Sequence, residues 1–251
     1  MYKREQIRDE LKKQLAIELN CEPEDFSKKE NIITIAKDRE GRRRYSKQIP
    51  FFSMATLGEN AVISADASMK EWLEKWSSDK RGVWLFEQPN IMELYEELKK
   101  RGKKLGQSHH MFLPDTGLCN PQIDFDIAWF EKEDIQNLYG REEFSNALCD
   151  TYNEDRPDML AVGAMKGTDI IGLAGCSADT KLFWQIGIDV LPEYRGAGIG
   201  TKLVAALKDE IFRRGAIPFY GTGLSNIFSQ NIAVNCGFYP AWVEMEQCVN
   251  E

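Results

Sequence analysis

The 251-residue sequence predicts an α/β (α+β) fold built from two domains. Apolar residues recur at helical spacing near the N-terminus and again after residue 199, and short apolar runs bounded by turn residues indicate strands between them. A stretch rich in proline and glycine, residues 113–122, suits a linker. We therefore expect a smaller N-terminal α+β domain at residues 1–120 and a second domain at residues 121–251.

The first half alternates helix and strand patterns. Within residues 1–20, apolar side chains stand four residues apart, which predicts an amphipathic helix: Ile7, Leu11, Leu15 and Leu19. Strands are expected at 31–36, towards 49 and at 61–65. Two further helices are expected after the N-cap residues Ser68 and Asn90. The basic cluster Arg42-Arg43-Arg44 is expected to be an exposed turn.

The second half predicts a longer series of elements. In chain order these are a strand at 125–130, a helix at 133–150, a hairpin over 159–177, a strand at 183–190, a helix at 199–214, a strand near 219, a helix at 227–236 and a strand at 241–248. Only 13 residues follow Phe238, so one strand fits there and leaves an open edge. We expect the N-terminal domain to cover or complete that edge, since open edges promote aggregation.

Three alternate glycines follow the strand that ends at Val190: Gly196, Gly198 and Gly200. Without side chains they allow a ligand to approach the backbone. The amides of this turn and of the next helix's first turn point into one space, where the helix dipole favours negative charge. We predict a phosphate or pyrophosphate site. The spacing differs from the dinucleotide fingerprint, and Gly200-Thr201-Lys202 inverts the order of a P-loop.

The segment Arg195-Gly-Ala-Gly-Ile-Gly200 resembles the acyl-CoA signature of the GNAT N-acetyltransferase superfamily. A second block, with Asn226, Ser229, Gly237 and Phe238, is similar to what that superfamily carries after its central helix. The resemblance implies a mixed, mostly antiparallel sheet flanked by helices. It also implies acetyl-CoA as acyl donor, with its pyrophosphate held by backbone amides of the turn.

On this resemblance, the residues expected to bind acetyl-CoA are Ile188, Val190, Arg195, Gly196, Ala197, Gly198, Ile199, Gly200, Thr201, Asn226 and Ser229. The strand before the signature would splay from its neighbour, so that main-chain groups around Ile188 and Val190 bond the acetyl and pantetheine groups. Asn226 would reach the pantetheine arm. Its alternative role is an ordinary helix N-cap, and the two roles are compatible.

The catalytic residues depart from the family pattern. Family members often place a tyrosine, the acid, four residues before the glycine of Gly-Phe, where this chain has Ala233. Tyr220, Tyr239 or water could replace it. A family glutamate often stands where this chain has Gln185. Asp189 is the candidate base, acting directly or through water, and Glu244 is the reserve. The alternative for Asp189 is a carboxylate hydrogen-bonded in the sheet or to the other domain.

These features predict an acetyl-CoA-dependent N-acetyltransferase that moves an acetyl group to a primary amine by direct attack on the thioester. The alternative is a non-catalytic acyl-CoA-binding sensor or interaction protein with the same fold. Residues 1–125 contain 22 basic and 21 acidic residues, whereas residues 126–251 contain 10 and 19. Such an acidic half would attract a cationic amine and repel nucleic acid. The uneven charge is equally consistent with general solubility.

The remaining composition limits partners and compartment. The six cysteines include no Cys-x-x-Cys pair and are expected to be reduced, as in a cytoplasmic protein. His109 and His110 are the only histidines, so we expect no metal site. We expect no membrane partner, because no run of 18 apolar residues occurs, and no signal peptide, because the N-terminus is charged throughout. The acceptor would be a small-molecule or peptide amine, and the oligomeric state is left open.

Overall fold

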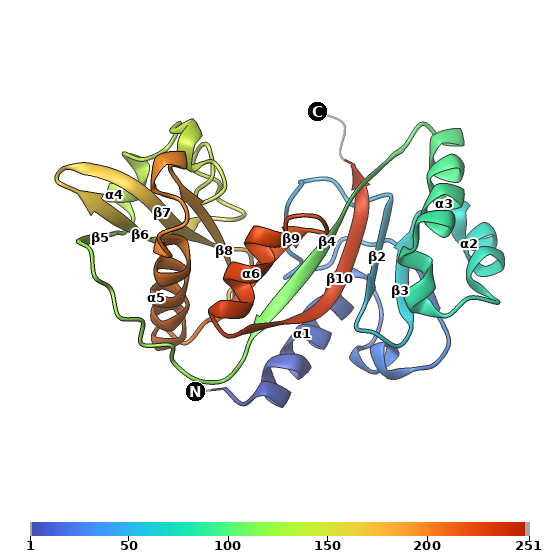
Figure 1. Ribbon diagram of the computed structural model, residues 1–251. Helices are drawn as coiled ribbons and strands as arrows, with labels where there is room; N and C mark the ends of the chain where they lie inside the picture. Colours follow the sequence, from blue (N-terminus) through green and yellow to red (C-terminus); the bar gives the residue numbers. More distant parts are fainter. Residues whose placement is uncertain (1, 249–251) are drawn as a thin grey trace. The chain divides into compact units, whose positions relative to one another are not determined.

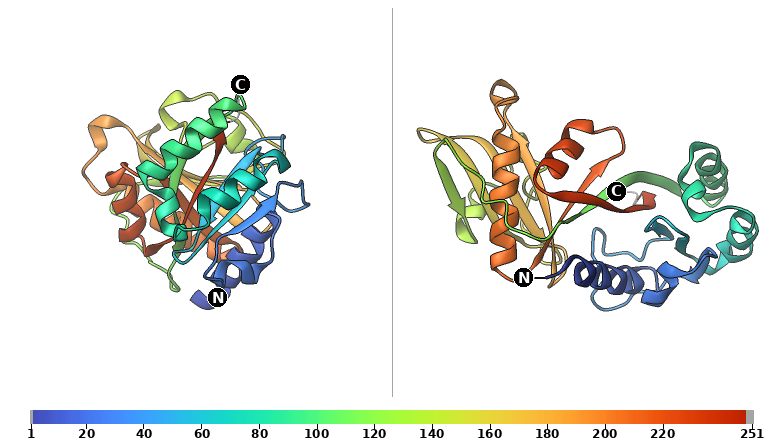
Figure 2. Two further views of the ribbon diagram at one scale, coloured as in Figure 1. Left: turned by 90° about the vertical axis from the view of Figure 1, so that its right-hand side faces the viewer. Right: turned by 60° about the horizontal axis from the view of Figure 1, so that its bottom comes forward.

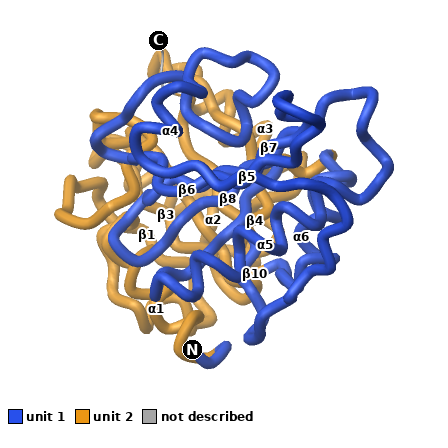
Figure 3. The backbone as a smooth tube through the Cα atoms, turned by 90° about the vertical axis from the view of Figure 1, so that its left-hand side faces the viewer, with its two compact units in different colours: residues 1–4, 112–222, 226–240 blue, residues 5–111, 223–225, 241–251 orange. Residues whose placement is uncertain are grey.

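The structure is a computed structural model, and it describes residues 2–248 (Figure 1). The chain forms two compact units (Figure 3). Among the described residues, unit 1 contains 2–4, 112–222 and 226–240, and unit 2 contains 5–111, 223–225 and 241–248. The domain boundary expected at residue 120 stays a prediction.

Unit 1 contains a five-stranded arrangement in the order β9-β8-β7-β6-β5. The strands are β5 (Ile127–Phe130), β6 (Asp158–Lys166), β7 (Asp169–Ala178), β8 (Phe183–Val190) and β9 (Ile217–Gly223). Neighbours pair antiparallel except β8 and β9, which are parallel. The predicted mixed, mostly antiparallel sheet flanked by helices is confirmed.

Two helices of unit 1 position the glycine-rich turn and the Asn226 block. They are α5 (Ile199–Arg213) and α6 (Ile227–Asn235), and a 3-10 turn, η5 (Pro192–Tyr194), precedes α5. Leu203, Leu207 and Ile211 of α5 are fully buried in the hydrophobic core of unit 1, as their four-residue spacing predicts. In a second view α5 runs beside the strands of this unit (Figure 2).

The helix expected at 133–150 is wrong. This segment forms only the short α4 (Glu133–Gln136) and the 3-10 turn η4 (Glu142–Phe144), joined by turns. Gly140 has a φ of +74°, outside the helical region. Further along, backbone amides that a helix would use internally are donated instead to carboxylates of distant strands, as described below. Three apolar residues at which a helix over 133–150 would face inward are nevertheless buried: Ile135, Leu138 and Leu148.

Unit 2 contains the strand order β1-β3-β2-β10-β4. The strands are β1 (Ile32–Ile35), β2 (Phe52–Thr56), β3 (Ala61–Ala65), β4 (Lys104–Pro114) and β10 (Phe238–Cys248), of which β4 and β10 extend into unit 1. The helices are α1 (Arg4–Glu18), α2 (Lys70–Ser77) and α3 (Gln88–Lys100), with 3-10 turns η1 (Pro23–Ser27), η2 (Ala67–Met69) and η3 (Gly82–Phe86).

The open edge expected after Phe238 is completed by the N-terminal half of the sequence. Residues 243–246 of β10 pair antiparallel with residues 53–56 of β2. Met245 thereby joins a core that also contains Leu73 and Leu94, from α2 and α3. The expectation that the first half of the chain completes this edge is confirmed.

Several expectations for the first half are corrected. No strand runs towards Ile49; β2 begins at Phe52 instead, and β4 was not predicted. The side chain of Asp66, not Ser68, caps the turn before α2, and α3 begins two residues before Asn90. The exposed basic turn is also wrong. Arg42 and Arg43 are buried, because both pair with carboxylates.

Candidate functional site

The turn between β8 and α5 has a backbone that glycine adopts most readily. Gly196 and Gly198 have φ angles of +84° and +78°, in the left-handed region. Gly198 is the N-cap of α5, and the first helical hydrogen bond runs from the Lys202 amide to the Gly198 carbonyl. The amides of the three residues between them therefore precede that bond and lie at the positive end of the helix dipole. This geometry suits an anionic oxygen.

Strand β8 separates from β9 just before this turn. The two strands pair over Phe183–Ile186, opposite Ile217–Tyr220, although β8 continues to Val190 and β9 to Gly223. A Cβ on Gly200 would lie 3.5 Å from side-chain atoms of both Ile188 and Val190. The fold thus brings the end of β8 beside the first turn of α5. This is the strand separation that the resemblance implied.

Arg195 lies exposed at the start of the turn, and its side chain folds back on β8. The guanidinium Nε donates to the Val190 carbonyl oxygen at 2.8 Å. A pantetheine amide that bonds to the same carbonyl would share this oxygen with Arg195. Because a carbonyl oxygen has two lone pairs, both bonds can be made.

The second predicted block forms the N-terminus of α6. Asn226 is the N-cap, and its Oδ1 accepts the Ser229 amide at 3.1 Å. The Ser229 hydroxyl lies 2.8 Å from the Tyr220 hydroxyl. The structure therefore shows the N-cap role, and it leaves a role of the amide nitrogen of Asn226 towards pantetheine as a prediction.

The two candidate acids differ in their surroundings. Burial raises the pKa of Tyr220 to about 12, so this phenol keeps its proton at neutral pH. Tyr239 carries the Arg4 guanidinium 3.7 Å above its ring centre, and its buried hydroxyl has no hydrogen-bond partner among the described residues. Ala233, which is fully buried in the hydrophobic core of unit 1, has only a methyl side chain and cannot donate a proton.

Asp189 is tied to the segment between η4 and β6. Its Oδ2 accepts the backbone amides of Asn146 and Ala147, at 2.8 and 3.0 Å. Its Oδ1 accepts the Asn146 side-chain amide at 2.7 Å. Asp189 is thus a hydrogen-bonded carboxylate, as in the alternative, but its partners lie in a loop of unit 1 and neither in the sheet nor in the other domain. The assignment of Asp189 as the base stays a prediction.

Gln185 belongs to a polar row beside Asp189 on β8. Its Oε1 accepts a hydrogen bond from Arg156 at 3.2 Å, and Arg156 pairs with the buried Asp179 at 3.0 Å. Ser177, the partner of Gln185 on β7, donates to the same carboxylate. The position at which the family often has a glutamate is therefore held by a neutral side chain bound to an arginine.

Unit 2 contains a separate cluster of carboxylates around Arg43. This buried guanidinium bonds Glu18 at 2.6 Å and Glu244, the reserve base, at 2.7 Å. Glu244 also accepts the Trp242 indole N–H at 2.6 Å. Glu246 lies two residues further along β10. Burial, and next the charge of Glu244, raise the pKa of Glu246 to about 7.

Sequence reasoning did not select Glu246. The Glu-x-Glu spacing places both carboxylates on one face of a strand, which was the available signal, but burial of that face could not be read from the sequence. A carboxyl with a pKa near 7 can gain and lose a proton at physiological pH.

Comparison with known proteins supports the resemblance to the GNAT superfamily. Residues 125–238 match the model described as "Acetyltransferase (GNAT) family". This segment is a GNAT-family domain. The match contains the turn, β8 and all four residues of the Asn226 block. The match supports a general acetyltransferase role for this segment. No curated protein matched the sequence.

Solved structures with similar folds share little sequence with the chain. A GNAT-family protein of Novosphingobium aromaticivorans is 17% identical, with a TM-score of 0.43, and the match covers 58% of this chain and 66% of that one. A GCN5-related N-acetyltransferase-like protein from Streptococcus suis is 18% identical, with a TM-score of 0.47 and coverage of 63% and 68%. The yncA protein of Salmonella typhimurium, solved with its cofactor acetyl-CoA, is 17% identical, with a TM-score of 0.36 and coverage of 49% and 92%.

Within residues 2–248, no helix is both long and apolar enough to cross a membrane. The same residues contain no group of three or more His, Cys, Asp or Glu side chains placed to hold a metal ion.

Proposed function

We propose that the chain is an acetyl-CoA-dependent N-acetyltransferase that moves an acetyl group to a primary amine by direct attack of the amine on the thioester. The observation that carries the proposal is the arrangement of β8, the glycine-rich turn and α5. There, left-handed Gly196 and Gly198 open a helix N-terminus beside a strand end that has separated from β9.

The residues at this place fit acetyl-CoA. The amides that precede the Lys202–Gly198 hydrogen bond would hold the pyrophosphate. The end of β8 at Ile188 and Val190, unpaired with β9 in the registered ladder, would bond the pantetheine and acetyl groups through its main chain. Arg195, Ala197 and Thr201 flank the same turn, and Asn226 with Ser229 would contact the pantetheine arm. Acetyl-CoA supplies the thioester carbonyl and the thiol leaving group.

The structure supports the acetyl-CoA site more directly than it supports any residue as acid or base. An amine must lose a proton before attack, and the departing sulfur must gain one. Tyr220 and Tyr239 are the phenols that could serve the sulfur in place of the missing tyrosine at Ala233. For the base, Asp189 remains the candidate from the sequence, although its three hydrogen bonds give it a competing role.

A second function is favoured by two specific observations. Ala233 is buried where the family often has its acid, and Gln185 is bound to Arg156 where the family often has a glutamate. Both changes would suit a non-catalytic acyl-CoA-binding sensor with the same fold. Affinity for CoA does not distinguish the two functions, whereas turnover does.

The test is thiol release from acetyl-CoA in the presence of single primary amines, small molecules and lysine peptides among them. Mass spectrometry of each mixture detects the amine with an added acetyl group. We expect thiol release that depends on the amine and matches the acetylated product in amount. Tight acetyl-CoA binding without thiol release across a broad set of amines would support the sensor instead.

A further inference from the structure

We propose that Asp189 is a positioning residue that, together with Asp158, fixes residues 145–149, here called the strap, across the sheet of unit 1. The strap would thereby hold the end of β8 in the shape needed for acetyl transfer. The proposal rests on the proposed acetyltransferase function for its effect on activity, but its structural part can be tested without it.

Two carboxylates, here called the pins, accept hydrogen bonds from the strap. The first pin is Asp189. It accepts three hydrogen bonds, all from Asn146 and Ala147, with donor–acceptor distances between 2.7 and 3.0 Å. Hydrogen bonds to an ionised carboxylate are among the stronger ones in proteins. The donors lie more than 40 residues away in the sequence, so these bonds join two segments of the unit that are far apart along the chain.

The second pin is Asp158 at the start of β6. Its Oδ2 accepts the Cys149 amide at 3.1 Å, and burial raises the pKa of this carboxyl. The strap is thus tied at one end to β8 and at the other to β6, and it crosses β7, which lies between those strands.

Two glycines let the strap lie directly on the sheet. Gly175 of β7 and Gly187 of β8 are cross-strand partners. A Cβ on Gly187 would lie 1.8 Å from the Asn146 carbonyl oxygen, and one on Gly175 would lie 2.2 Å from the Ala147 carbonyl oxygen. No side chain larger than hydrogen fits at either position, so backbone contacts backbone here.

This contact supports the part of β8 that β9 no longer supports. Registered pairing with β9 ends at Ile186, and Gly187 is the next residue. From there to Val190, the strand is held by β7 on one edge and by the strap on its face. This is the stretch whose main chain is proposed to bond the acetyl group, so loosening the strap would misplace the thioester.

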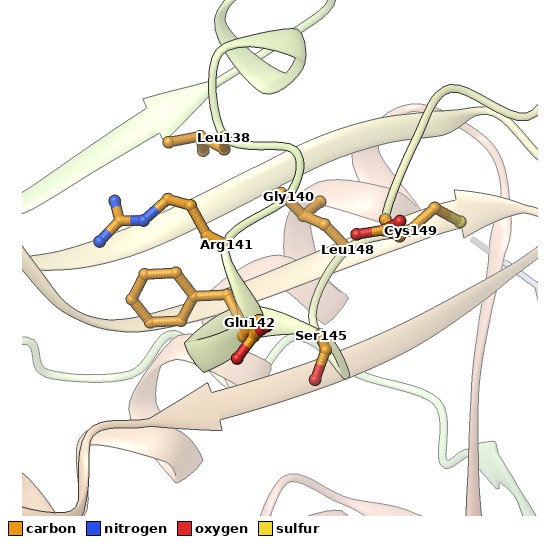
Figure 4. A pocket seen from close by; sticks show the side chains of 9 residues that line it. Leu138, Gly140, Arg141, Glu142, Ser145, Leu148 and Cys149 are labelled. Carbon is orange, nitrogen blue, oxygen red and sulfur yellow. The ribbon is translucent and has the colours of Figure 1, made fainter.

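A pocket of about 150 Å³ adjoins the strap (Figure 4). Its lining residues are Leu138, Gly140, Arg141, Glu142, Phe144, Ser145, Leu148, Cys149 and Asp150. Side chains beside empty space have fewer attractive contacts. Ala147 and Leu148 are nevertheless buried against residues of β6 and β7, so the hydrogen bonds to Asp189 and Asp158 add to this packing.

If Asp189 only positions the strap, swapping the side chains of residues 189 and 146 should preserve activity. If Asp189 is the catalytic base, the swap should abolish it. In Asp189→Asn, the new amide oxygen can still accept the strap amides, but its NH₂ group faces the NH₂ group of Asn146. In Asn146→Asp, two carboxylates face each other. Combining the two substitutions restores a donor–acceptor pair in the opposite direction, without restoring a carboxylate at position 189.

The experiment measures hydrogen exchange of the amides at 146, 147 and 149, together with kcat and KM for acetyl transfer over a range of pH. Asp169→Asn, the same change at the exposed first residue of β7, is the control. We expect each single substitution to lower exchange protection and kcat at least roughly tenfold. The double variant should recover both to within about threefold of the wild type, with the wild-type pH profile.

A double variant with restored protection but with kcat as low as Asp189→Asn would overturn the positioning role and support a base. A double variant without restored protection would overturn the pins themselves. If the wild-type chain releases no thiol with any amine, the proposed function fails, and the exchange data alone still decide whether Asp189 and Asn146 fix the strap.

Discussion

Adding one methyl group at Gly187 should displace the strap and destabilise the chain measurably. The Cβ of Gly187→Ala would lie 1.8 Å from the Asn146 carbonyl oxygen. Since real contacts of this kind are not shorter than about 3.0 Å, the strap must move by about 1.2 Å or β8 must bend. The three hydrogen bonds to Asp189, now 2.7 to 3.0 Å long, would stretch beyond bonding distance.

The magnitude follows from these losses. Overpacking costs about 1–3 kcal/mol, and losing charge-assisted hydrogen bonds costs about 1.5–3 kcal/mol each before relaxation. Because relaxation recovers part of this, we expect the free energy of unfolding to fall by roughly 3–5 kcal/mol. That is a large share of the typical 5–15 kcal/mol.

Urea unfolding followed by circular dichroism measures this change. Gly223→Ala is the matched control, because a Cβ there meets no atom within 4 Å and the residue lies on the neighbouring strand β9. We expect the control to change the free energy of unfolding by less than about 1 kcal/mol. A loss below about 1 kcal/mol for Gly187→Ala as well would show that the strap does not rest on the sheet as described.

Three further changes test other parts of the molecule. Gly198→Ala places a side chain at a φ of +78°, a strain of about 1–2 kcal/mol. The free turn should relieve this strain by leaving the left-handed conformation, which CoA binding must then restore, so the Kd of CoA measured by calorimetry should rise roughly 5- to 30-fold. Gly215→Ala, at +83° at the far end of α5, should leave the Kd unchanged; equal effects would contradict the site. Burial raises the Glu246 pKa from 4.5 to about 7, so the folded chain keeps a proton that the unfolded chain loses. The contribution of Glu246 to the free energy of unfolding should therefore fall by about 3 kcal/mol as pH rises through this window; Glu246→Gln should remove this contribution from the pH dependence seen in urea titrations, and an unchanged pH dependence would refute it. Raising salt should increase KM for cationic amines several-fold but not for neutral ones, and no salt effect on cationic substrates would reject attraction by the acidic half.

Local patterns predicted the parts of the fold that local interactions determine. The spacing of Gly196, Gly198 and Gly200 after an apolar strand predicted the turn, and the structure shows left-handed conformations at the first two. Leu203 and Leu207 face the core as their four-residue spacing requires. In each case the residues that decide the structure lie within two helical turns of each other.

The missed features depend on partners that are distant in the sequence. The helix expected at 133–150 does not form, because its amides bond to Asp158 and Asp189, and Asp189 lies 43 residues beyond Asn146. Arg43 is buried because it meets Glu18 and Glu244, which are 25 and 201 residues away. No periodicity within a window of the sequence contains that information.

The most direct test of the acyl-CoA site is hydrogen exchange of the wild-type chain with and without acetyl-CoA. Bound pyrophosphate should accept hydrogen bonds from the amides at the start of α5, and pantetheine should bond the end of β8. We predict that acetyl-CoA slows exchange most at residues 196–201 and 188–190, with a smaller effect at 226–229. Protection confined to other segments, or none at saturating acetyl-CoA, would contradict the assignment of this turn as the acyl-CoA site.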